Sequence, residues 1–156
     1  MKLLFKQKMF SWFDSYDVLT EAGELAYRVK GQFSWGHLLK IFDRTDREVG
    51  TVKQRIWAWM PTFEIYEGNT CLGCIRKQVS LFRPRFHLDC KNWQLQGSVW
   101  EWNYRILDAA GETVATVKKE IAWTDTYSID VYDPANALYA LMLVIAIDAE
   151  KCSRND

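Results

Sequence analysis

The chain has 156 residues, 20 basic and 20 acidic side chains, and an aromatic content of 15% that includes eight tryptophans. This length predicts one domain over residues 1–156 with a substantial core. Balanced charge without a basic tail argues against a nucleic-acid partner. It also gives no overall attraction to an anionic membrane, although a local basic patch could still bind one. The apolar opening is interrupted at Lys6 and Lys8, short of the roughly 7–15 apolar residues of a signal peptide. We therefore expect a cytoplasmic protein with reduced cysteines and no cofactor.

After an opening strand at about residues 3–7, three hairpins follow one pattern. Each has an apolar strand, a polar turn centred on Gly or Asp, and a second strand ending in Val-Lys, at residues 18–30, 41–53 and 106–118. Gly and Asp tolerate the positive φ that such turns require. The second and third hairpins match at seven positions with a constant offset of 65, beginning with Ile41 and Ile106. This indicates an internal duplication, with convergence on a common hairpin pattern as the alternative.

Further alternating segments lie at residues 63–66, 71–77, 86–89, 93–96 and 127–131. The total of about twelve short strands at regular spacing is typical of an all-β sandwich or barrel. Closure into a barrel removes the exposed edges of so large a sheet. The lumen of so wide a barrel needs a filling beyond the strands' own side chains.

Residues 135–147 provide that filling, because Asn136 is their only polar member. Asp133 and Pro134 form a helix start, with a capping carboxylate followed by proline at the first helical position. A helix that is apolar all round must be buried on every side, and this run is shorter than the about 20 residues of a membrane span. We predict a mainly β fold, a closed antiparallel barrel of about 12 strands around a central hydrophobic C-terminal helix at about 134–150, and not an integral membrane protein. Asp148 opposes the helix dipole, so we expect it to meet a Lys, an Arg or a backbone donor at the barrel rim.

Several segments resemble the LURP-one-related family of the tubby-like superfamily, which also holds tubby and the phospholipid scramblases. The similarity runs over nearly the whole chain, through residues 6–11, 14–18, 29–36, 93–97, 125–131 and 144–148. The resemblance implies a twelve-stranded antiparallel barrel around a central C-terminal helix. It also implies a link to lipids, because tubby proteins bind phosphoinositides through surface basic residues and scramblases are associated with calcium and lipid movement. No individual lipid-contacting position can be carried over to this sequence.

One cysteine and histidine spacing is that of a zinc site. Cys71, Cys74, His87 and Cys90 follow the pattern C-x2-C-x12-H-x2-C, and thiolates with an imidazole suit tetrahedral zinc. However, Cys74 and His87 fall in predicted strands, where successive side chains point to opposite faces. Ordinary reduced cysteines are therefore the favoured interpretation, and a zinc-dependent enzyme stays an alternative.

No other motif predicts catalysis. The acidic residues Asp43, Asp46 and Glu48 do not follow the calcium-loop pattern, since Glu48 and Gln54 stand where Gly and Glu are needed; a solvated hairpin tip is the favoured interpretation. Neither a nucleophile elbow nor a phosphate-binding glycine loop is present. We expect no enzyme.

The basic positions remain as binding candidates. The residues that we predict to contact an anionic phospholipid surface or a protein partner are Lys6, Lys8, Arg83, Arg85, Lys118 and Lys119. Tryptophans at alternating spacing lie nearby, at Trp57, Trp59, Trp100 and Trp102. Aromatic rings beside cations favour a membrane interface, but the favoured interpretation is that these tryptophans face the helix.

The sequence thus predicts a non-enzymatic binding or adaptor protein, cytoplasmic or peripheral to a membrane, that acts through its outer surface. The alternatives are a carrier of a small apolar ligand, as closed barrels can be, and a zinc-dependent enzyme. The plugged lumen leaves little room for cargo.

Overall fold

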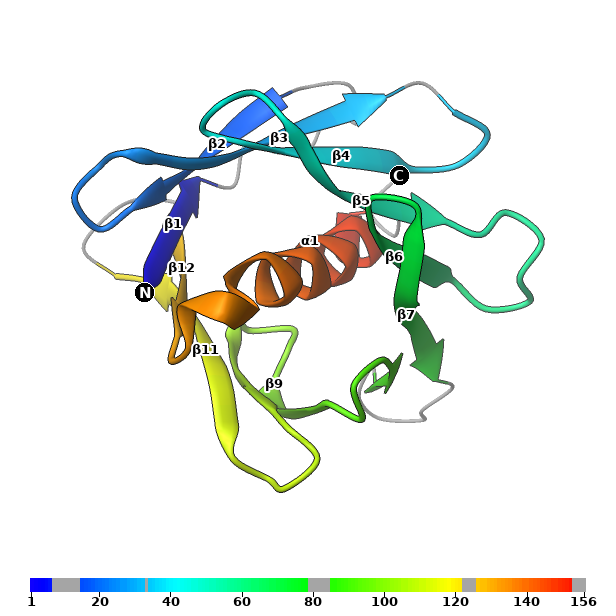
Figure 1. The fold of residues 1–156 in the computed structure, drawn as a ribbon. Coiled ribbons are helices and arrows are strands. Elements are labelled where there is room, and N and C mark those ends of the chain that lie inside the picture. Colours follow the sequence, from blue (N-terminus) through cyan, green and yellow to red (C-terminus); the bar gives the residue numbers. More distant parts are fainter. Residues whose placement is uncertain (7–14, 33, 79–84, 122–125, 153–156) are drawn as a thin grey trace.

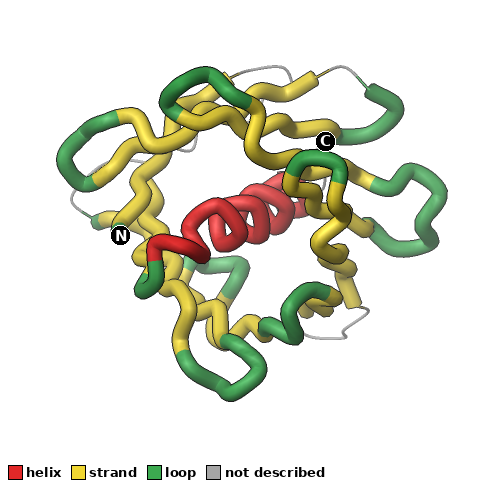
Figure 2. The backbone as a smooth tube through the Cα atoms, in the orientation of Figure 1, coloured by secondary structure: helices red, strands yellow, loops and turns green. Residues whose placement is uncertain are grey.

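The computed structural model describes residues 1–6, 15–32, 34–78, 85–121 and 126–152. One antiparallel sheet curls around a single long helix (Figures 1 and 2). The strands are β1 (Lys2–Lys6), β2 (Ser15–Thr20), β3 (Leu25–Gln32), β4 (Leu38–Asp43), β5 (Glu48–Gln54), β6 (Thr62–Glu67), β7 (Thr70–Gln78), β8 (Arg85–Asp89), β9 (Gln94–Ser98), β10 (Asn103–Leu107), β11 (Thr113–Glu120) and β12 (Thr126–Val131). A 3-10 turn η1 (Pro134–Asn136) leads into helix α1 (Ala137–Cys152).

The sheet order makes the barrel nearly closed. Strands pair in the order β8-β7-β6-β5-β4-β3-β2-β1-β12-β11-β10-β9, so β1 joins the two halves of the chain. The twelve strands and the enclosed helix confirm the predicted fold, but no backbone ladder joins the described residues of β8 and β9. At this seam Trp93 packs edge-on against Tyr139 of α1, with ring centroids 4.8 Å apart. Side chains thus cover the place where the strand ladder is interrupted.

The three predicted hairpins share one turn geometry. In each, the fourth residue of the turn has a positive φ: 81° at Gly23, 61° at Asp46 and 84° at Gly111. The Asp43 Oδ1 atom accepts hydrogen bonds from the backbone N–H groups of residues 45 and 47, and the Asp108 Oδ1 atom accepts from those of 110 and 112. Each hairpin also has a register shift just before its turn. The repeated sequence pattern therefore encodes a repeated bulged hairpin whose turn depends on an aspartate or threonine at its start.

Helix α1 lies inside the barrel. The Asp133 side chain accepts a hydrogen bond of 3.0 Å from the Ala135 N–H, as a helix-start cap does. From Ala140 to Ala149 every residue is buried. A methyl group built on Gly50 of β5 would come within 2.8 Å of the Met142 sulfur, so glycine at this register lets the helix approach the sheet closely. The all-apolar run is thus explained by burial on all sides.

The up-and-down order gives the barrel two different ends. At the helix-entry end lie the tight turns that join β2 to β3, β4 to β5, β6 to β7, β8 to β9 and β10 to β11, together with the start of α1. At the helix-exit end lie the described connections at residues 34–37, 55–61 and 99–102 and the last turn of α1.

Candidate functional site

Three of the predicted basic residues come together at the helix-exit end. Lys6 ends β1 opposite Thr126 of β12, and Thr126 in turn lies opposite Glu120 of β11. Lys118 and Lys119 directly precede Glu120 and are exposed, as is Lys6. Three adjacent strands, β1, β12 and β11, thus place these lysines at one margin of the barrel. Of the other predicted residues, Lys8 and Arg83 lie outside the described residues, and Arg85 starts β8 with a side chain that the structure does not describe.

Glu120, which follows the lysine pair on β11, forms its ion pair with a different lysine. Its carboxylate pairs with Lys2 at 3.1 Å. A hydrogen bond from Ser128 and the Lys2 contact hold the pKa of Glu120 below its usual value. The carboxylate makes its direct contacts with Lys2 and Ser128, while Lys118 acts on it only through its charge and Lys119 lies over the Tyr127 ring. Lys6, Lys118 and Lys119 remain exposed at this margin.

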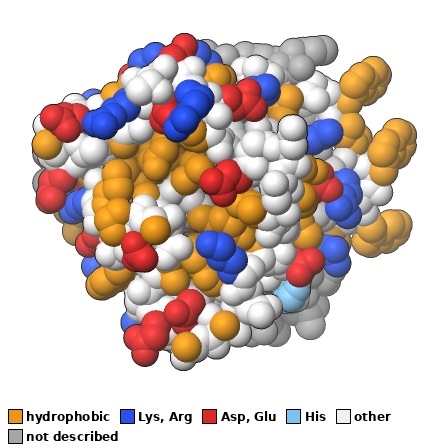
Figure 3. Space-filling model, viewed as in Figure 1, with side chains coloured by type: hydrophobic (Ala, Val, Ile, Leu, Met, Phe, Trp, Pro, Cys, Tyr) orange, Lys and Arg blue, Asp and Glu red, His pale blue; other side chains and the backbone are white. Residues whose placement is uncertain are grey.

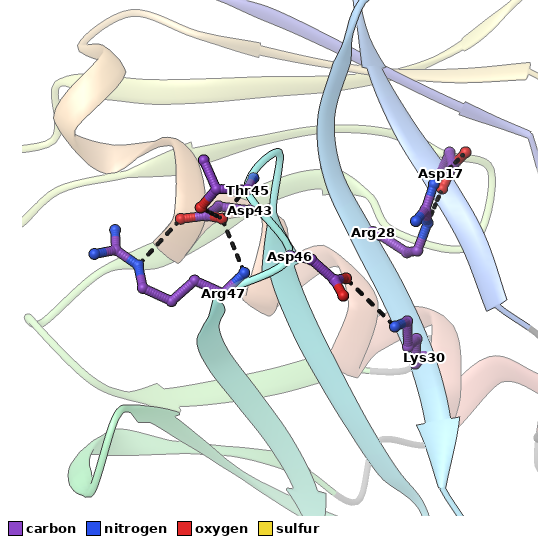
Figure 4. A network of polar contacts seen from close by, with 7 residues as sticks. All are labelled: Asp17, Arg28, Lys30, Asp43, Thr45, Asp46 and Arg47. Carbon is purple, nitrogen blue, oxygen red and sulfur yellow. Dashed lines mark hydrogen bonds and ion pairs between the residues drawn. The ribbon is translucent and has the colours of Figure 1, made fainter.

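Lys6 also lines an open groove of about 710 Å³ that runs along β1, β2 and β3. Two further cations of this groove already have partners (Figure 4): Arg28 forms a two-point contact with Asp17 at 2.8 and 3.4 Å, and Lys30 lies 3.5 Å from Asp46. Within the described part of the chain Lys6 has no ion pair. The groove thus offers Lys6 for an external anion, whereas Arg28 and Lys30 are matched by carboxylates of the chain itself.

Charge is divided unevenly between the two ends of the barrel. The connections at the helix-entry end, with two residues on either side, carry eleven acidic and three basic residues. The described residues of the helix-exit end, counted in the same way and with the last turn of α1, include three acidic and seven basic residues. The acidic residues are Glu101, Glu120 and Glu150, and the basic ones are Lys6, Lys53, Arg55, Lys77, Arg85, Lys119 and Lys151. Of these, Lys77, Glu150 and Lys151 are buried. The acidic residues at the entry end are Glu21, Glu24, Asp43, Asp46, Glu48, Glu67, Asp89, Asp108, Glu112, Asp130 and Asp133. A chain with no net charge is therefore a molecule with a negative and a positive end.

The interpretation that the tryptophans face the helix is wrong for two of them. Trp102 is 6% exposed and does pack in the core, but Trp57 and Trp59 are 95% and 98% exposed. The reason is that residues 55–61 form a connection of turns and bends between β5 and β6, so the alternating spacing there is not that of a strand. Hydrophobic side chains protrude from the side of the molecule that carries the β3–β4 and β5–β6 connections (right in Figure 3).

Sequence reasoning missed the neighbours of these tryptophans, Trp35, Lys53, Arg55 and Arg76. Trp35 is 86% exposed in the bend before β4. Arg55 pairs with Glu64 at 2.6 Å, and this contact lowers the pKa of the Glu64 carboxyl. The signals for a loop were available in Pro61, which excludes a central strand, and in Gly36.

The cysteines and His87 do not form one set of ligands. Cys74 and Cys90 are buried, whereas Cys71 and His87 are exposed. Burial raises the pKa of the Cys90 thiol, which disfavours the thiolate that zinc binding needs. Among the described residues no group of three or more His, Cys, Asp or Glu side chains is arranged to hold a metal ion. This geometry gives the zinc alternative no support.

Ionisable residues are buried near the end of α1. Lys77 of β7 pairs with Glu150 at 2.8 Å, and the Lys151 ammonium donates to the carbonyls of Val99 and Trp100 at 3.1 Å each. Asp148 is 2% exposed, and neither of its oxygens has a hydrogen-bond partner within the described part of the protein. The expectation that it meets a donor at the rim is therefore wrong. Burial raises the pKa of Asp148 to about 7, an effect that Lys151 partly opposes.

Within the described ranges, no helix has the length and apolar character needed to cross a bilayer. The LURP-one-related family profile matches residues 1–148. The uncharacterized protein YxjI of Bacillus subtilis strain 168 is 25% identical over 149 residues, which cover 95% of this chain and 92% of that protein. The X-ray structure of a protein from Arabidopsis thaliana matches with a TM-score of 0.65 at 15% identity, over 96% of this chain and 90% of that one. That structural similarity supports the same fold, and the match to the family profile shows that the chain belongs to the LURP-one-related family.

Proposed function

We propose that this protein is a non-enzymatic binding module that associates peripherally with an anionic membrane surface through the helix-exit end of its barrel. The observation that carries this proposal is the division of charge between the two barrel ends. A cytoplasmic membrane surface is negative and attracts basic side chains within about a Debye length. It attracts the helix-exit end and repels the acidic entry end, so the same charges that promote binding also orient the molecule.

The exposed lysines at the margin of β1, β11 and β12 are the residues that we assign to this contact. Lys6 lies on β1 and the Lys118–Lys119 pair on β11, the two strands that flank β12. Each lysine near an anionic surface contributes about 1 kcal/mol, so the three together contribute about 3 kcal/mol, or about 150-fold in affinity. This is the strength expected of a reversible peripheral contact.

The interior does not favour the alternative of an apolar carrier. Helix α1 occupies the lumen, and the large helix side chains Leu141, Met142 and Leu143 are almost fully buried against the barrel. The described grooves lie along strands at the outside, with charged residues in their lining. A ligand at the outer surface therefore fits the structure better than a ligand inside it.

Co-sedimentation with vesicles tests the proposal. The full chain is mixed with phosphatidylcholine vesicles that contain either no phosphatidylserine or about 30% of it, at low and at high salt. We expect binding to the anionic vesicles that weakens as salt rises, because exposed charges are screened within about 10 Å at 0.1 M. The variant Lys6→Gln/Lys118→Gln/Lys119→Gln should bind about 150-fold more weakly at low salt.

A matched control removes the same charge from the other end. Arg44→Gln/Arg47→Gln/Lys91→Gln changes three basic residues of the entry-end turns and should leave binding nearly unchanged, because these turns point away from the membrane in the bound orientation. If the wild-type chain does not bind anionic vesicles at low salt, the membrane proposal fails. A protein partner with an acidic face would then be the remaining candidate.

A further inference from the structure

Four large apolar side chains are exposed to solvent on two neighbouring connections at the helix-exit end. The exposed fractions are 86% for Trp35, 47% for Ile56, 95% for Trp57 and 98% for Trp59. We call these four residues the tryptophan rim. Single exposed apolar residues are common on protein surfaces, but an exposed cluster of indoles marks an interaction site.

The two connections are fixed to one another. The Gln54 N–H donates to the His37 carbonyl at 2.7 Å, and the His37 N–H donates to the Gln54 side-chain oxygen at 3.1 Å. A methyl group built on Gly36 would lie 3.2 Å from a side-chain carbon of Ile56. Trp35 and Trp57 thus belong to one continuous surface, although they are far apart in sequence.

The longer connection is also anchored to the barrel. The Arg55 N–H donates to the Thr62 carbonyl at 2.8 Å, and the Lys77 N–H donates to the Pro61 carbonyl at 3.2 Å. The buried Thr62 hydroxyl donates to the Met60 carbonyl at 3.0 Å. These contacts hold residues 55–61 at both ends, so the indoles of Trp57 and Trp59 project outward from a fixed base.

Three cations lie beside the β5–β6 part of the rim. Lys53 precedes this connection, Arg55 begins it with its guanidinium paired to Glu64 at 2.6 Å, and Arg76 lies opposite Thr62 across β6 and β7. Tryptophan favours the membrane–water interface, because its ring is apolar and its N–H can bond to water or to headgroups. Flanking cations complement anionic headgroups. The combination of outward indoles with a basic margin, at the end of the molecule away from its acidic turns, matches the apolar and anionic layers of a lipid bilayer.

Resting on the function proposed above, we infer that the tryptophan rim inserts into the interfacial layer of an anionic bilayer. The bound molecule then has the exit end of α1 toward the lipid and its hairpin turns toward the solvent. The lysines supply attraction that salt weakens, and the indoles supply an apolar contribution that persists in salt. If about 100 Å² of each ring leaves water, binding increases roughly 70-fold for each ring.

The test compares Trp57→Ala/Trp59→Ala with the wild-type chain in co-sedimentation with vesicles containing about 30% phosphatidylserine. Both rings are almost fully exposed, so the variant should melt at the wild-type temperature. With roughly 70-fold for each ring, we expect binding about 5,000-fold weaker, with loss of the binding that the wild-type chain retains at high salt. The control is Tyr132→Ala, which removes a 69% exposed ring at the helix-entry end and should bind like the wild-type chain.

The outcomes separate this inference from the proposed function. If the lysine variant loses binding while Trp57→Ala/Trp59→Ala binds like the wild-type chain, the insertion is refuted and the electrostatic contact stands. If Tyr132→Ala weakens binding as much as the double tryptophan variant does, the assigned orientation is refuted. If the wild-type chain binds no vesicle, both proposals fail, and the tryptophan rim is then a docking surface for a protein partner.

Discussion

The buried carboxylate of Asp148 should make the barrel less stable as pH rises. Its pKa is raised from 3.8 to about 7 by burial, against the opposing charge of Lys151. The folded state therefore favours the protonated acid, whereas the unfolded chain loses this proton near pH 4. Stability from the neutral form is complete below about pH 4, declines as pH rises, and is lost above about pH 7.

The magnitude follows from the two pKa values. A pKa raised from 3.8 to about 7 corresponds to about 4 kcal/mol, at 1.36 kcal/mol for each pH unit. Between pH 5 and pH 8 the free energy of unfolding should fall by about 2.5 kcal/mol on this account. Tyr104, whose hydroxyl is also buried and lacks a described partner, faces the same charge. It stays protonated throughout this pH range, because burial and Asp148 raise its pKa.

The test is urea unfolding followed by circular dichroism at several values between pH 5 and pH 8. Asp148→Asn keeps the shape of the side chain and removes its titration, so its stability should exceed that of the wild-type chain by an amount that grows with pH. Asp130→Asn, at an exposed position of β12, controls for loss of one acidic charge. If the wild-type and Asp148→Asn curves stay parallel over this range, Asp148 does not titrate as a buried acid and the reasoning is wrong.

Two further variants test the fold. Leu141→Asp should prevent soluble folding, because Leu141 is 1% exposed on α1 and the cost of burying an unpaired charge exceeds the roughly 5–15 kcal/mol of stability of a small domain. The control Leu141→Met should cost less than about 1.5 kcal/mol. A soluble Leu141→Asp variant with a cooperative melting transition would contradict helix burial. Gly73→Ala should lower the free energy of unfolding by about 3 kcal/mol or more, because φ is 142° and a methyl group would lie 2.1 Å from the Asp89 carbonyl oxygen. Gly68→Ala, with a φ of 56° in open space, should cost only about 1–2 kcal/mol, and equal losses at the two glycines would refute the steric argument.

The main features of the fold could be predicted from local chemistry. The apolar run after Asp133 and Pro134 predicts an enclosed helix, and the repeated turn residues, such as Asp43 and Asp108, predict the bulged hairpins that form. These signals are local, so a single sequence carries them. The seam between β8 and β9 depends on how Trp93 meets Tyr139 across the barrel, and no local pattern encodes that contact.

The candidate site was only partly predictable. Lys6 and the Lys118–Lys119 pair were selected by charge, and the strand register then brings them to one margin. The position of Trp57 was misjudged, because alternation every second residue is the same in a strand as in an extended loop. Similarly, Asp148 was expected to find a donor because a helix end usually lies near one, whereas here the last turn of α1 stays inside the barrel.

The most direct test of the account is the quenching of tryptophan fluorescence by brominated lipid in anionic vesicles, measured for the wild-type chain and for Trp57→Phe/Trp59→Phe. Bromine in the acyl chains quenches only those indoles that reach the interfacial layer. Docking through the tryptophan rim should give strong quenching in the wild-type chain, of which only the contribution of Trp35 remains in the double variant. Equal quenching in the two proteins, or none in the wild-type chain at low salt, would contradict a barrel that docks on a membrane through its tryptophan rim.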